Sequence, residues 1–503
     1  MACSRRSTQR SRAATLGSSD QIESERNRLD LEAQGSSRRH VLKTAALVAA
    51  GGLASGGTIN VVSPSVLSAR KDFDANVSHW SKALPAANAS LDHDLEADIV
   101  VIGGGFTGLS SAFYLRKVLP GKRVVLLEAE RCGNGASGRN GAMVLTMSDD
   151  RYMRLSGDPQ TDRRLYDLTS QNIRALQTLS AELGIDCELD RNGALQVLND
   201  GQDLEDAKEF VARSQEAGFP FELWVRERTA AAIGTTAYLG ALFDPGSGQV
   251  HPGKLVALWK AAAAAAGAEI YDGTPVANID EGPIHRIVTA AGHTIRAPIL
   301  VLATNAYSSR LGYLRGTVAP ISDYVAITPV LTEAQLETAG WKLAIPFNDS
   351  RTEVHYAGLT RDRRIHFGGG HVDYVFNDGT YDQSQATARH AGIRREFARV
   401  FPSLADVDFE TVWGGAVDMS LDGSPAVGRM GRNGNIFYGI GYSGHGVNMT
   451  SIFGRVIADL VAGHHEQWSW LPFLNRLPPY IPNEPFRWLA VRAGITYTRL
   501  TES

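Results

Sequence analysis

The stretch ADIVVIGGGFTGLSSAFYLRKV, residues 97–118, constrains the fold more than any other part of the chain. The apolar run 99–102 predicts a buried strand, and glycines at 103, 105 and 108 separate it from a helical pattern of apolar residues. In this G-x-G-x-x-G spacing Gly103 permits a tight turn, Gly105 lets the backbone approach a pyrophosphate, and Gly108 lets the helix lie close to the strand. The first helical turn then presents free N–H groups to phosphate. The motif predicts a Rossmann-like unit that binds a dinucleotide.

A second apolar strand, RVVLLEA at 123–129, ends in Glu128 and Ala129. Glu128 lies about 20 residues beyond the last glycine, where such folds place the carboxylate that holds ribose hydroxyls. A carboxylate there favours a 2′-hydroxyl, because it would repel a 2′-phosphate. Phe106, Thr107 and Ala129 belong to the same predicted nucleotide contact.

The loop after this acid collects small residues around a single cation. A simple nicotinamide-nucleotide domain would continue with a helix and a third strand, but here GASGRNGA follows at 135–142. Glycine in such number marks either a mobile surface loop or backbone that approaches a ligand. We favour the second interpretation, with the loop against an isoalloxazine ring and a pyrophosphate and with Arg139 near negative charge. The predicted contacts are Gly135, Ala136, Ser137, Gly138, Arg139, Asn140 and Gly141.

A second strand, glycine loop and helix occur at 435–463, NIFYGIGYSGHGVNMTSIFGRVIADLVAG. A helix N-terminus stabilises negative charge, and a flavin that accepts a hydride acquires such charge on its ring. A nicotinamide-binding fold has no need of this distant counterpart of 103–108, so the pairing favours FAD. His445 either contributes to that stabilisation or fills the turn. The predicted contacts are Gly441, Gly444, His445, Gly446 and Val447.

These glycine-rich segments resemble those of the D-amino-acid-oxidase-like (DAO) family of FAD-dependent oxidoreductases. GASGRNGA, WGGAVDMSLDGSPAVGR at 413–429 and the tail 478–500 are most similar to the branch that contains gamma-glutamylputrescine oxidoreductase. The resemblance implies noncovalent FAD, because the histidine that carries the flavin in some relatives is absent from 130–144 and Cys132 is expected to be a small buried thiol. It further implies that the backbone of Val276 contacts adenine and that Ala303 and Thr304 lie near the pyrophosphate.

We therefore expect an α/β fold, α+β in part, with a Rossmann-like FAD-binding domain assembled from discontinuous segments and an antiparallel-sheet substrate domain. The predicted FAD-binding parts are 97–190, 246–310 and 413–465, the predicted substrate-domain parts are 191–245 and 311–412, and 466–503 forms a tail on the core. Helices are expected over 160–185, from Pro252 to Gly267 and near 384–400, and strands over 192–198, 269–271, 324–331 and 364–371.

The resemblance implies oxidation of a C–N bond in an amine or amino-acid derivative, with hydride transfer to flavin N5 and hydrolysis of the imine. Electrons would then pass to oxygen or to a respiratory acceptor. The alternatives are a nicotinamide-dependent dehydrogenase and an exported flavin-binding protein that serves electron transfer or assembly without its own small substrate. We predict no general base.

Candidate substrate contacts are few. Amino-acid oxidases of this superfamily often grip the substrate carboxylate with an arginine, but the comparable place here holds Val417 or Asp418. Asp418 would face either an ammonium or an ion-pair partner within the fold. Tyr356 is a candidate substrate contact. The nearby side chains alternate along strands and are better explained as ordinary strand positions than as a metal site, so no metal is predicted: His355, Arg363, His366 and His371.

The first 69 residues differ from the rest. Residues 1–36 lack apolar periodicity and predict disorder. Arg38 and Arg39 precede a weakly apolar stretch, 44–54, which is typical of a twin-arginine signal, although Val41 stands where Phe is usual. We expect export of the folded, cofactor-loaded protein by the twin-arginine machinery to the periplasm, with an uncleaved membrane anchor or a plain basic tail as alternatives.

Composition excludes several other classes of protein. A net charge of −4, without a basic stripe, indicates no nucleic-acid partner. Three scattered cysteines form neither a disulfide framework nor a zinc site.

Overall fold

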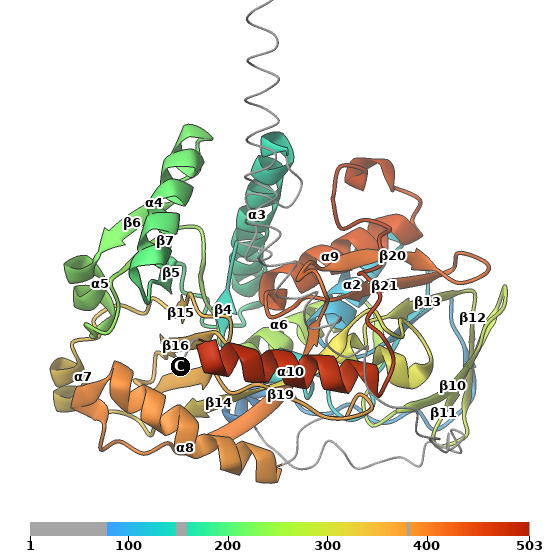
Figure 1. Cartoon of the computed structure of the whole chain (residues 1–503). Coiled ribbons are helices and arrows are strands. Elements are labelled where there is room, and N and C mark those ends of the chain that lie inside the picture. Colours follow the sequence, from blue (N-terminus) through green and yellow to red (C-terminus); the bar gives the residue numbers. More distant parts are fainter. Residues whose placement is uncertain (1–77, 147–157, 380–382, 502–503) are drawn as a thin grey trace, which may run out of the picture.

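The computed structural model describes residues 78–146, 158–379 and 383–501 (Figure 1). The predicted signal, residues 1–69, lies outside this range. Among the helices within it, none is both long and apolar enough to span a bilayer.

A six-stranded sheet forms the nucleotide-binding half, and only its edge pair β20–β21 is antiparallel. In spatial order the strands are β20 (Ala426–Met430), β21 (Ile436–Ile440), β13 (Ile299–Leu302), β2 (Ile99–Ile102), β3 (Val124–Leu127) and β9 (Glu269–Tyr271). Strands β2 and β3 are apolar and buried at every position, as parallel strands must be when both faces of their sheet are covered.

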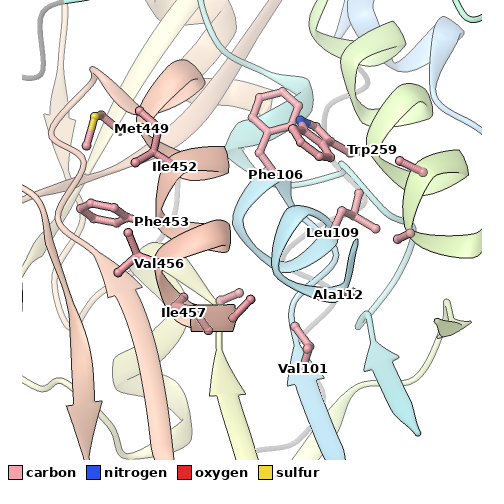
Figure 2. Close-up of a cluster of buried hydrophobic side chains, with 14 of the residues drawn as sticks. Val101, Phe106, Leu109, Ala112, Trp259, Met449, Ile452, Phe453, Val456 and Ile457 are labelled. Atoms are coloured by element: carbon pink, nitrogen blue, oxygen red, sulfur yellow. The ribbon is translucent and has the colours of Figure 1, made fainter. Parts of the chain in front are cut away.

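Helices cover one face of this sheet. They are α2 (Phe106–Val118), α6 (Pro252–Ala265), α9 (Gly446–Val461) and α3 (Pro159–Leu183). Figure 2 shows the apolar side chains of α9 and α6 that pack on either side of α2, above Val101 of β2. Helices α2 and α9 cross closely because α9 has a glycine where α2 presents serines. A Cβ on Gly454 would lie 2.2 Å from Ser110 Oγ.

A small four-stranded sheet covers the other face. Its apolar residues Ile287 and Ile295 pack against Val100, Val125 and Leu300 of the large sheet. Sequence reasoning did not identify this sheet as a separate layer. Its strands are β1 (Leu95–Glu96), β12 (Thr294–Ala297), β11 (His285–Thr289) and β10 (Val276–Asp280).

A nine-stranded sheet forms the other half of the molecule. Its main path runs through β18 (Asp373–Tyr374), β14 (Ala319–Ile327), β17 (Ile365–Gly369), β16 (His355–Leu359), β15 (Phe347–Asp349), β5 (Ala194–Val197), β7 (Gly240–Asp244) and β6 (Glu222–Val225), with β19 (Thr411–Met419) paired to β14. The described helices around it, on the side of Figure 1 away from β10 and β11, are α4 (Gly201–Glu216), α5 (Arg226–Ile233), α7 (Glu333–Ala339) and α8 (Gln383–Val400).

Two features of this sheet correct the expectation. It is not purely antiparallel, because β5 and β15 pair in parallel. The boundary at residue 413 is also wrong, since β19 belongs to this sheet through its register with β14 and the chain leaves it only after Met419. The two halves are further joined by the short ribbon of β4 (Met143–Val144) and β8 (Gly248–Gln249).

Most expected elements occur close to their predicted bounds. Helix α3 ends at Gly184, whose φ of 63° is a left-handed cap, and α6 begins at Pro252. The tail contributes α10 (Phe486–Thr501), whose Trp488, Val491 and Ile495 pack against Tyr374 and Ile481. This packing holds the tail against the substrate half.

Candidate active site

The first glycine loop turns the chain from β2 into α2. Gly103 has φ of 107°, and a Cβ there would lie 2.4 Å from the carbonyl oxygen of Ala303. A Cβ on Gly108 would lie 1.8 Å from the Gly103 carbonyl oxygen, so only glycine lets α2 lie this close to the strand. Both predicted roles of these glycines are confirmed.

The N-terminus of α2 is suited to an anion. Gly105 at its N-cap offers no side-chain cap, and the first turn contains no acid. The N–H of Phe106 donates to Ser137 Oγ at 2.9 Å, which joins the helix to the loop 135–141, while the Phe106 ring lies in the core. Phe106 therefore serves the site through its backbone position, and its ring is a packing group.

The loop 135–141 is held by side chains that sequence reasoning missed. Its three consecutive carbonyls at residues 138, 139 and 140 accept hydrogen bonds from Ser78 Oγ (2.5 Å), Trp413 Nε1 (2.9 Å) and Trp80 Nε1 (2.9 Å). Ser78 and Trp80 belong to the segment η1 (His79–Ala83) and its N-cap, which precedes the nucleotide-binding domain. These three donors fix the orientation of the loop backbone. No local pattern around Trp80 indicates this contact.

Arg139 extends from the same loop toward the nine-stranded sheet. Its Nε donates to the carbonyl oxygen of Asn134 at 2.7 Å and its Nη1 to that of Gly414 at 3.2 Å. Arg139 thus links the loop to β19. Its predicted contact with the negative charge of a cofactor stays a prediction.

The second glycine loop is held by Asp418. This buried carboxylate accepts from the backbone N–H groups of Gly441 (2.6 Å) and Tyr442 (3.2 Å). Burial raises its pKa to about 7. We had expected Asp418 to face an ammonium or an ion-pair partner, but among the described residues no cationic side chain pairs with it, and it positions the turn that leads into α9.

The two glycine loops meet at this end of the sheet. Tyr442 and Thr107 join their hydroxyl groups at 2.8 Å. His445 is the N-cap of α9, whose first turn also lacks an acid and a side-chain cap. Gly441 and Gly444 have φ of 76° and 93°, conformations that glycine adopts without strain.

Glu128 lies beside the first loop. Its Oε2 accepts from the Gly104 N–H at 2.6 Å, and burial raises its pKa to about 7. The N–H of Thr274 donates to the Glu128 carbonyl oxygen at 2.8 Å, which brings the start of β10, and so Val276, alongside. The Cys132 thiol is buried nearby, and burial raises its pKa well above its usual range. A thiol in this state is not a group for a flavin linkage.

The structure brings most of the predicted cofactor residues to the carboxyl ends of β2, β3, β13 and β21. Contacts between the segments, given above, join these residues into one cluster: Gly103, Gly105, Phe106, Thr107, Gly108, Glu128, Ala129, Gly135, Ala136, Ser137, Gly138, Arg139, Asn140, Gly141, Ala303, Thr304, Gly441, Gly444, His445, Gly446 and Val447. The donor set fits FAD, because two helix N-termini without acids in their first turns meet beside a carboxylate suited to ribose, and among their first N–H groups Phe106 donates to Ser137.

Tyr356 lies across from this cluster on β16. A Cβ on Gly141 would lie 2.5 Å from the Tyr356 ring, so this ring touches the glycine-rich loop. His355 points to the other face, toward Phe367. Within the described residues no group of three His, Cys, Asp or Glu side chains is arranged to hold a metal.

The chain is similar to several oxidoreductases over most of its length. It is 31% identical to a probable oxidoreductase OrdL of Rhizobium meliloti over 398 residues, which cover 78% of this chain and 89% of that protein. It is 30% identical to gamma-glutamylputrescine oxidoreductase of Escherichia coli over 405 residues, 79% of this chain and 89% of that protein. These relatives confirm the branch indicated by the glycine-rich segments.

The fold is shared with a solved glycine oxidase from Geobacillus kaustophilus, at a TM-score of 0.63 and 22% identity over 77% of this chain and 100% of that one. The family model described as "FAD dependent oxidoreductase" (DAO) matches residues 98–460. This match confirms FAD as the cofactor and makes a nicotinamide-dependent enzyme untenable. The chain belongs to the DAO family of FAD-dependent oxidoreductases.

Proposed function

We propose that the protein oxidises a C–N bond of an amine or amino-acid derivative, with noncovalently held FAD. One observation carries this proposal: two helix N-termini and the loop 135–141 converge opposite a sheet face that presents Tyr356. Bound FAD would supply a hydride acceptor at N5, so that the substrate would lose a hydride from the carbon next to nitrogen and a proton from the nitrogen, and water would hydrolyse the imine to a carbonyl compound and an amine or ammonia.

The residues of the chain contribute orientation and electrostatics. The N-terminus of α9, with His445 as its N-cap, stabilises negative charge that develops beside it. Asp418 and Tyr442 hold that N-terminus in place. Ser78, Trp80 and Trp413 hold the opposing loop, which limits the motion of the surface against which the reacting groups lie.

Electrons leave the enzyme for oxygen or a respiratory acceptor, and the protein works in the periplasm after twin-arginine export. Arg38, Arg39 and the weakly apolar stretch 44–54 support the export route. This route carries proteins that have already folded, which suits a protein that binds its cofactor in the cytoplasm.

The visible absorption spectrum of the purified protein, before and after acid precipitation, tests the cofactor state. A band near ~450 nm, which is typical of oxidised flavin, should move into the supernatant, whereas colour that stays in the pellet would show a covalent link. Anaerobic addition of primary amines, secondary amines and α-amino acids should then bleach the band, and the carbonyl product is trapped and identified. A flavoprotein that no amine or amino acid bleaches would support the electron-transfer or assembly alternative.

A further inference from the structure

One face of the nine-stranded sheet is turned toward the loop 135–141. Cross-strand partners share a face, and the registers pair Asp323 with Gly415, and Tyr356 with Gly368. Val325 pairs with Gly368 and so links the two pairs. All these residues therefore lie on one face, across strands β14, β16, β17 and β19.

This face contacts the cofactor loop directly. A Cβ on Gly141 would lie 2.5 Å from the Tyr356 ring, and a Cβ on Gly415 would lie 3.2 Å from Arg139 Cβ. Asp323, directly opposite Gly415, is consequently at the boundary between the two halves of the molecule. It is partly buried, as is Tyr356, so neither side chain is sealed into the core.

Asp323 is the one charged residue that these four strands present on this face. The other residues there are apolar or neutral: Ala319, Ile321, Val325, Ile327, Tyr356, Gly358, His366, Gly368, Thr411, Trp413, Gly415, Val417 and Met419. His366 counts as neutral because burial lowers its pKa to about 3. Val417, where some amino-acid oxidases would have an arginine, is one of the apolar members. The four strands thus contribute an acid and no cationic side chain to this face, against which Arg139 packs from the loop 135–141.

The carboxylate of Asp323 has neutral partners. Tyr356 donates its hydroxyl to Oδ2 at 2.7 Å, and the N–H of Tyr324 donates to Oδ1 at 2.8 Å. Within the described ranges no lysine or arginine lies within ion-pair distance of it. Two other buried acids of the same sheet do have such partners, since Asp349 pairs with Arg351 and Asp373 with Arg389.

A carboxylate in a partly desolvated site is stabilised when a cation reaches it. Burial alone raises the pKa of Asp323 above its usual value, and a bound cation would oppose that shift. The hydrogen bond from Tyr356 fixes the orientation of Oδ2, and the remaining lone pairs of the Asp323 carboxylate are available to a ligand.

We infer that Asp323, oriented by Tyr356, binds a protonated nitrogen of the substrate and makes the enzyme selective for alkylamines over α-amino acids. This inference rests on the proposed function and names its substrate class. An α-amino acid would bring its carboxylate to a face whose own strands hold an acid and no cation, while the neighbouring Arg139 guanidinium already donates to the carbonyl oxygens of Asn134 and Gly414. The bound nitrogen is either a second one in a diamine or the amine that is oxidised, which then passes its extra proton to the Asp323 carboxylate before the hydride leaves the neighbouring carbon.

Two unreactive probes of the same shape and opposite charge test the binding step. tert-Butylammonium and pivalate share a tert-butyl group, and neither carries hydrogen on the carbon next to its charged group, so neither is oxidised. Their binding to the FAD-loaded protein is followed through the flavin absorption spectrum and by calorimetry. We expect tert-butylammonium to bind the wild type at least tenfold more tightly than pivalate.

Asp323→Asn should weaken tert-butylammonium binding by about tenfold or more, whereas Tyr356→Phe, which keeps the carboxylate, should weaken it less. Asp362→Asn, which removes an exposed charge in the turn between β16 and β17, is the matched control and should leave both affinities unchanged. An Asp323→Asn protein that retains FAD and binds tert-butylammonium within twofold of wild type would overturn the inference. Tighter binding of pivalate than of tert-butylammonium to the wild type would do the same.

Substrate panels show which substrate nitrogen binds Asp323. They also distinguish failure of the proposed function from failure of this inference. A monoamine and a matching diamine with equal kcat/KM indicate that Asp323 holds the reacting nitrogen, while a preference for the diamine, lost in Asp323→Asn, indicates the second nitrogen. Absence of bleaching by every amine and amino acid refutes the proposed function. Bleaching by amines that Asp323→Asn leaves unaffected, in kcat/KM and in probe binding, refutes this inference alone.

Discussion

At the scale of the residue, Asp418 shows how a buried acid positions a backbone turn. It accepts from Gly441 and Tyr442, and burial raises its pKa to about 7 from an ordinary value of 3.8. The folded state therefore binds a proton that the unfolded state has released between these two values. The contribution of this proton to stability is present below pH ~4 and is lost as the pH rises through ~7.

Asp418→Asn should remove this pH dependence, because the amide oxygen still accepts from Gly441 and carries no titrating proton. Urea unfolding of both proteins at pH 5, 6, 7 and 8 measures the pH dependence of the free energy of unfolding. Relative to the variant, the wild type should lose at most about 1.4 kcal/mol of unfolding free energy per pH unit up to pH ~7. Parallel stability curves for the two proteins would contradict this assignment.

Gly105→Ala tests the room that the first loop leaves for its ligand. The added Cβ would lie 2.9 Å from Ser137 Oγ and would displace the hydrogen bond from Phe106. We expect FAD affinity to fall by about tenfold, equivalent to ~1.4 kcal/mol, in titrations of the apoprotein. Gly121→Ala, where a Cβ meets nothing within 4 Å, is the control and should bind FAD as the wild type does.

Residues whose role follows from local spacing were predictable, and those that act across the fold were not. Gly103, Gly105 and Gly108 carry a spacing that only a strand-turn-helix requires. Trp80 and Asp323 lie in stretches without a motif, and their partners are distant in sequence. Asp418 was noticed for its charge, but the amides that bind it come from another segment, so its role could not be inferred.

At the scale of the element, the crossing of α2 and α9 supports the whole site, because both cofactor-facing N-termini belong to these helices. Gly454 permits the crossing, since a Cβ there would lie 2.7 Å from the backbone nitrogen of Ser111. Gly454→Ala should lower the unfolding free energy by about 1–3 kcal/mol through overpacking. Gly201→Ala, in open space at the start of α4, should leave the unfolding midpoint unchanged or raise it. Equal unfolding midpoints for the wild type and Gly454→Ala would contradict this prediction, because they would show that α2 and α9 accommodate the added methyl group without loss of stability.

The segment η1 acts as a clasp on the loop 135–141. Trp80→Phe keeps an aromatic ring in the core and removes the donor to the Asn140 carbonyl oxygen. We expect a several-fold faster loss of FAD during dialysis, measured by flavin fluorescence. Trp341→Phe removes an equivalent donor, to the Leu343 carbonyl oxygen in the other half, and should change stability without faster FAD loss. Equal rates of loss in the two variants would count against the clasp.

Helix α3, whose apolar residues have a clear helical period, was predicted within a few residues, and so were β9 and β21, each of which lies next to a predicted helix. The strands of the four-stranded sheet are two to five residues long and lie next to no predicted helix, which is why this sheet was missed as a layer. The parallel pairing of β5 with β15 depends on how distant segments meet, and no local sequence preference determines it.

At the scale of the whole molecule, export before or after folding determines where FAD is acquired. Replacing Arg38 and Arg39 with lysine should abolish periplasmic flavoprotein and leave it, FAD-loaded, in the cytoplasm. Fractionation with flavin fluorescence measures the outcome. Periplasmic flavoprotein that persists in the double variant would contradict twin-arginine export, and accumulation of the wild type in the membrane fraction would indicate the anchor.

The order of strands has a consequence for synthesis of the chain. β21 lies between β20 and β13, and α9 follows it at Gly446–Val461, so one of the two helix N-termini of the cofactor site is absent until the ribosome has translated nearly nine-tenths of the chain. The amino-terminal segment with its arginine pair emerges long before that. We therefore expect firm binding of FAD only after most of the chain has been made, and export by the proposed twin-arginine route would have to wait for it.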